Sequence, residues 1–167
     1  MYPGKWAREF PDKAAAIHAV SGETLTYRAL DERSNRLAQL MWAQGLRPGD
    51  HVAIFMENHL AYFEVVWAAL RSGLYLTTIN RYLTDEEAGY ILDNCEAKVL
   101  VSSSYLGEIA KTLPGYAPNC ERWLMVGEPV AGYESYEDAI GAHPAEKLAD
   151  EPAATWKFRF SRMTRSP

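Results

Sequence analysis

Apolar positions along the chain follow two periods, and their order predicts alternating strands and helices. Continuous apolar runs of about five residues, bounded by turn residues, predict strands with both faces covered. The predicted strands are 52–56, 75–79, 98–102 and 122–126. Segments of helical period lie before the first strand at 26–44, between the strands at 60–71, 84–92 and 105–113, and after the last strand at 136–141.

Strands joined through helices by short connections form parallel units, so we expect an α/β fold. The expected architecture has three layers, with a mostly parallel sheet between flanking helices. Strands 52–56, 75–79 and 98–102 should be neighbours in that sheet, and the helix near 60–71 should pack on it. Coordinates that placed these segments antiparallel would contradict the expectation.

The ends of the predicted helices carry recognisable capping residues. Thr26 is the expected N-cap of the first long helix, because its hydroxyl can accept from the amides of the first turn. Gly45 ends that helix. The polar face of the helix should be in water, and it carries Arg28, Glu32, Arg33 and Arg36. Residues 84–87, Thr-Asp-Glu-Glu, form a capping box. Before the first helix, 14–20 and 24–27 read as the two arms of a hairpin around the turn at 21–23.

Charge and composition exclude several classes of protein. The formal net charge is −5, which does not attract a polyanion, so nucleic acid is not an expected partner. The longest apolar stretch, 61–70, is interrupted by Glu64 and is shorter than the roughly 20 residues of a membrane span. The chain also opens without the apolar run of a signal peptide, and we therefore expect it to be cytoplasmic.

Each residue that could carry chemistry also has a structural explanation. Cys95 and Cys120 lack metal-ligand spacing and are expected to be reduced thiols. Residues 102–104, Ser-Ser-Ser, suit a strand end or a helix cap, and the acids at 85–87 suit a helix N-terminus. Glu64 lies on an otherwise apolar helix and is the strongest candidate for a functional carboxylate. We nevertheless favour a structural role for it, either partly exposed or paired.

An ordered set of short segments resembles the opening of the adenylate-forming superfamily, which includes acyl-CoA synthetases, luciferases and peptide-synthetase adenylation domains. No single segment is diagnostic, but together they follow the family's order over some ninety residues, with a preference for fatty-acyl synthetases. The segments are 11–14, 25–30, 33–38, 45–53, 57–58, 68–73, 80, 83–84, 90–92 and 97–100.

One departure from the family concerns its phosphate-binding loop. In the family, a Ser/Thr/Gly-rich loop ending in Pro-Lys-Gly follows a segment like 149–153. This loop binds phosphate because its glycines allow several backbone amides to surround the anion. Here 156–167 has four basic residues, no acidic residue and no glycine. We expect 1–155 to be an incomplete N-terminal subdomain and 156–167 an atypical basic tail that packs poorly. The tail could also be an edge strand or bind an anionic surface. We favour a third explanation, in which a shifted reading frame or a truncated gene model gives the tail a sequence unrelated to the family.

The resemblance implies a parent enzyme that joins a carboxylic acid to a thiol, and the preference for fatty-acyl synthetases points to a fatty acid. The parent would convert the acid and ATP, with Mg²⁺, to an acyl-adenylate and then, with CoA, to acyl-CoA and AMP. To this chain we assign no catalytic, cofactor-binding or metal residue and no cofactor, and we expect a fragment that is inactive alone. The alternative is a stand-alone, non-catalytic binding module. The incomplete sheet could also promote self-association.

Overall fold

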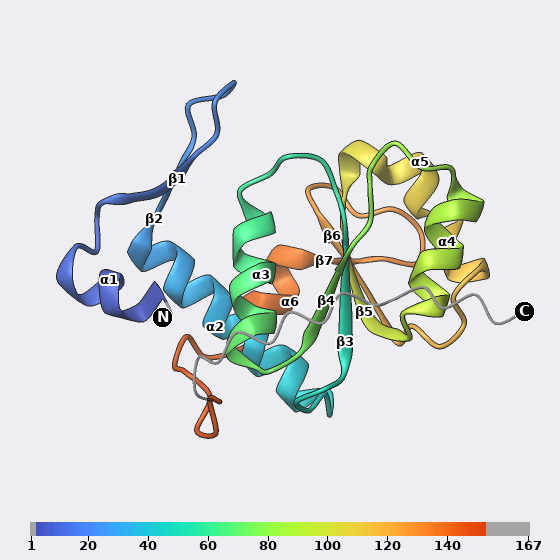
Figure 1. Ribbon diagram of the computed structural model, residues 1–167. Coiled ribbons are helices and arrows are strands. Elements are labelled where there is room, and N and C mark those ends of the chain that lie inside the picture. Colours follow the sequence, from blue (N-terminus) through green and yellow to red (C-terminus); the bar gives the residue numbers. More distant parts are fainter. Residues whose placement is uncertain (1–2, 153–167) are drawn as a thin grey trace, which may run out of the picture.

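The computed structural model describes residues 3–152, which form one α/β unit with a small hairpin at its N-terminal side (Figure 1). The tail at 156–167, for which poor packing is predicted, lies outside these residues. In chain order the elements are α1 (Pro3–Glu9), β1 (Ala14–Ile17), β2 (Thr24–Thr26), α2 (Tyr27–Ala43), β3 (His51–Phe55), α3 (Ala61–Arg71), β4 (Tyr75–Thr78), α4 (Asp85–Asn94), β5 (Ala97–Ser103), η1 (Ser104–Leu106), α5 (Gly107–Ala110), η2 (Leu113–Gly115), β6 (Arg122–Val126), β7 (Glu134–Ser135) and α6 (Tyr136–Gly141).

The main sheet has the order β4-β3-β5-β6-β7, and every pair of neighbours is parallel. The expectation that the first three apolar strands are neighbours is therefore confirmed. Strand β3 lies between β4 and β5, so the chain winds first to one side of β3 and then to the other. This order is that of a doubly wound sheet. Within the described residues, β4 and β7 are the two edge strands of this sheet.

Successive residues of the central strands enter two separate apolar cores. Val52 and Ile54 of β3 face the core formed with α2, α3 and α6, whereas Ala53 and Phe55 face the core formed with α4 and α5. Figure 1 shows the sheet edge-on, with α2, α3 and α6 on one side and α4 and α5 on the other. Because side chains alternate across a strand, a continuous apolar run supplies both cores at once. The three-layer prediction is confirmed.

Local capping signals in the sequence are realised in the structure. The Thr26 hydroxyl accepts from the backbone N–H of Ala29 at 3.2 Å and opens α2. Thr84 and Glu87 form the complete capping box of α4. Gly45 adopts a φ of +96° just after α2, a left-handed conformation that glycine tolerates well. Short-range patterns therefore placed these helix ends correctly.

Two regions differ from the prediction. A single helix over 105–113 is wrong, because this stretch is divided into η1, α5 and η2. The Thr112 hydroxyl donates to the carbonyl of Ile109 at 2.8 Å, and Pro114 has no N–H to continue the helix. The sequence pattern also missed α1 and β7. Strand β7 has only two residues, which is too short to show a period.

Candidate functional site

The carboxyl ends of β3 and β5 meet where the winding of the sheet reverses. In open α/β sheets this reversal point is the usual place for a ligand. Here the Ser103 hydroxyl donates to Glu57, which follows β3, and the Ser102 hydroxyl donates to the carbonyl of Phe55 at 2.7 Å. Both serines are buried. They fasten β5 to the end of β3, in agreement with the structural role expected at the strand end.

An open cavity of about 380 Å³ lies beside this point, over the ends of β3 and β4. Its polar groups come from Thr78 at the end of β4 and from the two loops that follow these strands, and Tyr62 adds an aromatic wall from the first turn of α3. The lining residues are Met56, Asn58, Tyr62, Thr78, Ile79, Asn80, Arg81 and Tyr82. The cavity therefore offers amide, hydroxyl and guanidinium groups next to apolar surface.

Arg81 forms a cationic and aromatic rim on this cavity. Its guanidinium lies 4.3 Å from the ring centroid of Tyr82 and 5.7 Å from that of Tyr105, and it donates to the Tyr82 hydroxyl. The hydrogen bond to Tyr82 is the main cause that raises the pKa of Arg81. The side-chain oxygen of Asn80 accepts from the backbone N–H of Tyr82 at 3.1 Å, which orients the loop. A cation beside exposed rings suits a planar or anionic ligand.

The sequence analysis did not single out Arg81, Tyr82 or Tyr105. Asn80 entered only as one of the segments that carry the family resemblance. A usable signal was present, because Arg81 and Tyr82 lie in the loop that follows β4, and Tyr105 lies just after β5. Parallel strands bring such residues to one edge of the sheet. The signal was missed because the order of the strands, and hence the reversal point, is a property of the tertiary fold.

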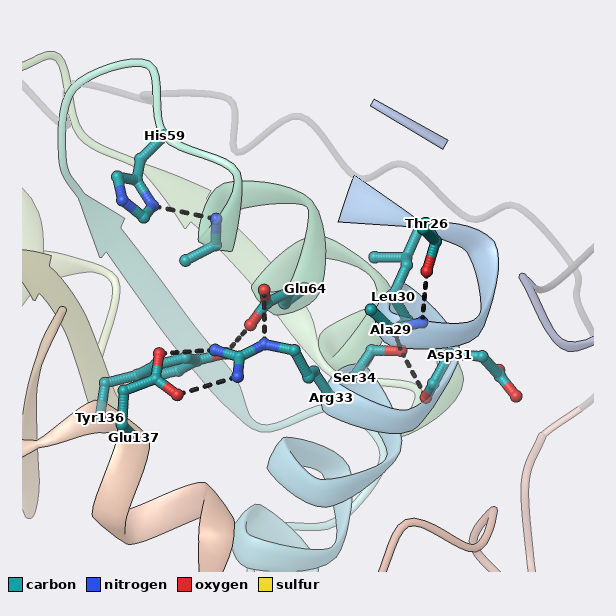
Figure 2. Close-up of polar contacts among 11 residues, drawn as sticks. Thr26, Ala29, Leu30, Asp31, Arg33, Ser34, His59, Glu64, Tyr136 and Glu137 are labelled. Atoms are coloured by element: carbon teal, nitrogen blue, oxygen red, sulfur yellow. Dashed lines mark hydrogen bonds and ion pairs between the residues drawn. The ribbon is translucent and has the colours of Figure 1, made fainter. Parts of the chain in front are cut away.

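Glu64, the carboxylate that stood out in the sequence, is 3% exposed and belongs to a buried polar network. Arg33 donates from Nε to its Oε1 at 2.8 Å, and the Tyr136 hydroxyl donates to its Oε2 at 2.8 Å. Figure 2 shows Arg33 between Glu64 and Glu137, whose two oxygens accept from the guanidinium at 2.8 and 2.6 Å. The paired role considered for Glu64 is the one that the structure contains. The expectation that Arg33 faces water is wrong, because this half-buried side chain joins α2 to α3 and α6.

The network also shifts the ionisation of its members. Burial raises the pKa of Tyr136 well above its ordinary value, and the neighbouring charge of Glu64 adds to this effect. Burial alone would lower the pKa of Arg33, but its hydrogen bonds with Glu137 and Glu64 outweigh burial and raise that pKa. Arg33 is therefore charged and Tyr136 neutral at physiological pH. Neither group is suited to proton transfer there, and the network stabilises the packing of three helices.

A second buried cation ties the last described residues to the helices. Arg71 is 1% exposed and donates to Asp31 at 2.7 Å, while its Nε lies 3.8 Å from Glu151. Pro152 lies against Gly73, at 3.3 Å from the position of a Cβ there. The segment near 150, which resembles the family's approach to its phosphate loop, is thus fixed at the C-terminal end of α3.

Other candidate chemistry receives little support from the described residues. Within 3–152, no three His, Cys, Asp or Glu side chains lie close enough together to hold a metal ion. Glu57 is the carboxylate at the sheet reversal, and it already accepts from Ser103, so a magnesium ion would need further ligands. In the same part of the chain, no helix combines the length and hydropathy required to cross a bilayer.

Together, the strand order and the polar carboxyl edge define a doubly wound α/β protein with a candidate ligand site beside its reversal point, over the ends of β3 and β4. The profile of the family described as "AMP-binding enzyme" matches residues 4–155, and the chain belongs to that family. The resemblance read from the sequence is therefore confirmed. The matched range includes every element described above except the first residue of α1.

Several characterised relatives are fatty-acid ligases. A fatty acid–[acyl-carrier-protein] ligase, ScoC, from Streptomyces coeruleorubidus is 31% identical over 133 residues, which are 80% of this chain and 25% of that protein. A long-chain-fatty-acid–CoA ligase from Thermus thermophilus is 29% identical over 157 residues, covering 87% of this chain and 29% of the ligase. This chain thus spans about a quarter of the length of these relatives.

Solved structures of ligases share the fold. The crystal structure of the anthranilate CoA ligase AuaEII with anthranoyl-AMP superposes with a TM-score of 0.77 at 22% identity, over 89% of this chain and 28% of the ligase. A Mycobacterium tuberculosis fatty acyl CoA synthetase superposes with a TM-score of 0.72 at 21% identity, over 92% of this chain and 29% of the synthetase. The chain is therefore a partial AMP-binding ligase domain, related to acyl-CoA synthetases.

Proposed function

We propose that this chain is the opening part of an acyl-CoA synthetase that activates a carboxylic acid, in particular a fatty acid, and that it makes no acyl-adenylate by itself. The parent reaction joins the acid to ATP with release of pyrophosphate, and CoA thiol then displaces AMP. Magnesium and bound cations would stabilise the charge on the phosphates. The cytoplasm, where ATP and CoA are available, is the proposed location.

The carboxyl edge of the sheet carries this proposal. It offers an open cavity and one exposed cation, Arg81, but the described loops there contain no run of glycines whose amides could surround three phosphates. The Glu57 and Ser103 side chains are engaged with each other. Catalysis requires dipoles and cations placed around the reacting phosphate, and packing of remote helices cannot replace them.

The test is acid-dependent exchange of pyrophosphate into ATP, measured with the purified chain and a panel of fatty and aromatic acids. The expected result is exchange no greater than in a reaction without acid. Acid-dependent turnover would refute the proposal of an inactive fragment. A Glu57→Gln variant would then show whether the activity depends on the reversal point or comes from a contaminating ligase.

The second candidate is a stand-alone binding module, favoured only by the open cavity at Arg81. Equilibrium dialysis of the chain against ATP, CoA or a fatty acid, each tested singly so that no reaction occurs, distinguishes the binding module from the inactive fragment. Tight binding of one of them by the isolated chain, lost in Arg81→Ala, would favour the module. Weak binding of all three would favour the fragment.

A further inference from the structure

One edge of the main sheet lacks the features that usually protect an edge strand. Within residues 3–152, strand β4 pairs with β3 alone, in a register without a bulge. Its four residues, Tyr-Leu-Thr-Thr, include no charged residue and no proline. Natural edge strands are usually protected by charged side chains, prolines, bulges or a very short length. The opposite edge, β7, is of this protected kind, because it has only two residues and one of them, Glu134, is charged.

The backbone of β4 directs hydrogen-bonding groups into this open edge. On the side of β3, the N–H group of Tyr75 donates to the carbonyl of Asp50 at 2.8 Å. Just after β4, the N–H group of Ile79 donates to the carbonyl of Ile54, also at 2.8 Å. Because successive residues of a strand point their backbone groups to opposite sides, those of Leu76 and Thr78 point away from β3. The N–H and C=O groups of both residues are therefore available to another strand.

The surface beside this edge is apolar and has no exposed charge. Tyr62 and Val66, one turn apart on α3, and Leu76 on β4 pack against the same core, yet all three remain half-buried. From the start of α3 to the end of β4 the chain has only two charged residues, Glu64 and Arg71. Both are buried and ion-paired. Although the chain has a net charge of −5, two copies can meet at this surface without bringing like charges together.

A second copy of β4 fits this edge in an antiparallel alignment. When Thr77 of one copy lies opposite Thr77 of the other, Leu76 of each copy lies opposite Thr78 of the other. Each of these two pairs exchanges two hydrogen bonds, so every outward N–H and C=O group of Leu76 and Thr78 is used. The two-fold axis is perpendicular to the sheet, which keeps both α3 helices on the same side, where their half-buried apolar residues meet. Such an interface is self-complementary and closes as a dimer.

We propose that two copies of this chain associate through β4, in an antiparallel arrangement that joins their two main sheets into one. The strand edge supplies the hydrogen bonds, and Tyr62 and Val66 of α3 supply apolar contact beside it. Both parts are needed, because a stable interface buries about 800 Å² on each partner and a four-residue edge alone buries less. The proposal gives the self-association considered from the sequence a defined edge and register.

Sedimentation equilibrium of the full chain over a range of concentrations tests the proposal. The chain should form a dimer, and Thr78→Pro and Thr78→Lys should each raise the dissociation constant at least about tenfold. Proline lacks the N–H that donates across the interface, and an edge lysine opposes the pairing of strands. Thr24→Lys is the matched control, because Thr24 is also an exposed threonine in a strand, and it should leave the dissociation constant unchanged. Circular dichroism and thermal midpoints would verify that all three variants fold.

Hydrogen exchange, read at single amides by NMR, tests the register. The amides of Leu76 and Thr78 should exchange more slowly as the chain concentration rises through the dissociation constant. In Thr78→Lys, the Leu76 amide should exchange rapidly at all these concentrations. A chain that stays monomeric at every concentration would overturn the proposal, and slow exchange of both amides in that monomer would show that another part of the same chain covers the edge. A dimer that tolerates both Thr78 substitutions, or one that Thr24→Lys weakens as much, would also overturn it by placing the contact elsewhere.

Discussion

The buried network around Glu64 allows a sharp prediction about stability. Replacing Arg33 with Met keeps much of the side-chain volume but removes the cation that donates to Glu64 at 2.8 Å. Glu64 would remain 3% exposed with the Tyr136 hydroxyl as its one described donor. Removal of one partner from a buried ion pair costs about 3–5 kcal/mol. We expect a value near the lower end, about 3 kcal/mol, because Arg33 itself is half-buried and the Tyr136 donor remains.

The same guanidinium provides an internal control. Glu137 also accepts from Arg33, but this carboxylate is mostly exposed. An exposed ion pair contributes about 0–1 kcal/mol, so Glu137→Gln should cost no more than that. Glu64→Gln should be intermediate, at roughly 1–2 kcal/mol, because its amide oxygen can still accept from Tyr136 while Arg33 keeps Glu137. The cost of each substitution should therefore depend on whether it leaves a buried charge without its ion-pair partner, and not on the number of hydrogen bonds that it removes.

Urea unfolding, followed by circular dichroism and tryptophan fluorescence, would measure these free energies if the two signals coincide. For a chain of this size, 3 kcal/mol corresponds to a fall of roughly 6–12 °C in the thermal midpoint. An Arg33→Met chain as stable as the parent would refute the reasoning. A loss in Glu137→Gln equal to that in Arg33→Met would also refute it, because the exposed pair would then matter as much as the buried one.

Three further variants or reagents test other features. Glu96 has a φ of +54°, which is costly for a residue with a Cβ, so Glu96→Gly should raise the free energy of unfolding by about 1 kcal/mol; an unchanged urea midpoint would argue against strain there. The hydrogen bond with Lys98 lowers the pKa of Asp50, so its contribution to stability is present above the unfolded pKa of about 3.9 and is lost as pH falls through the folded pKa. Asp50→Asn should thus be less stable than the parent at pH 7 but converge with it in acid, as measured by urea unfolding at both pH values, and a constant difference would contradict this. Burial raises the pKa of the Cys120 thiol to about 12, so mass spectrometry should detect maleimide on the half-buried Cys95 well before Cys120 at pH 8, with both labelled rapidly in urea; early labelling of Cys120 would show that its core opens.

The layered fold could be predicted from the sequence because its signals are short-range. The apolar runs of β3, β5 and β6 need both faces covered, and this requirement is visible in five to seven consecutive residues. The Thr84–Glu87 capping box is likewise complete within four residues and appears as read. The free energy that favours each of these elements is local, so their order along the chain implied a parallel sheet.

The pairing of polar side chains depended on the tertiary structure, because the partners are distant along the chain. Arg33 lies 31 residues from Glu64 and 104 from Glu137, and no local period distinguishes it from its solvent-facing neighbour Arg28. The rim of Arg81 with Tyr105 required the strand order, which brings the ends of β4 and β5 to the same edge on either side of β3. Side-chain period reports which face of an element is apolar, but only packing of the elements determines which polar groups meet.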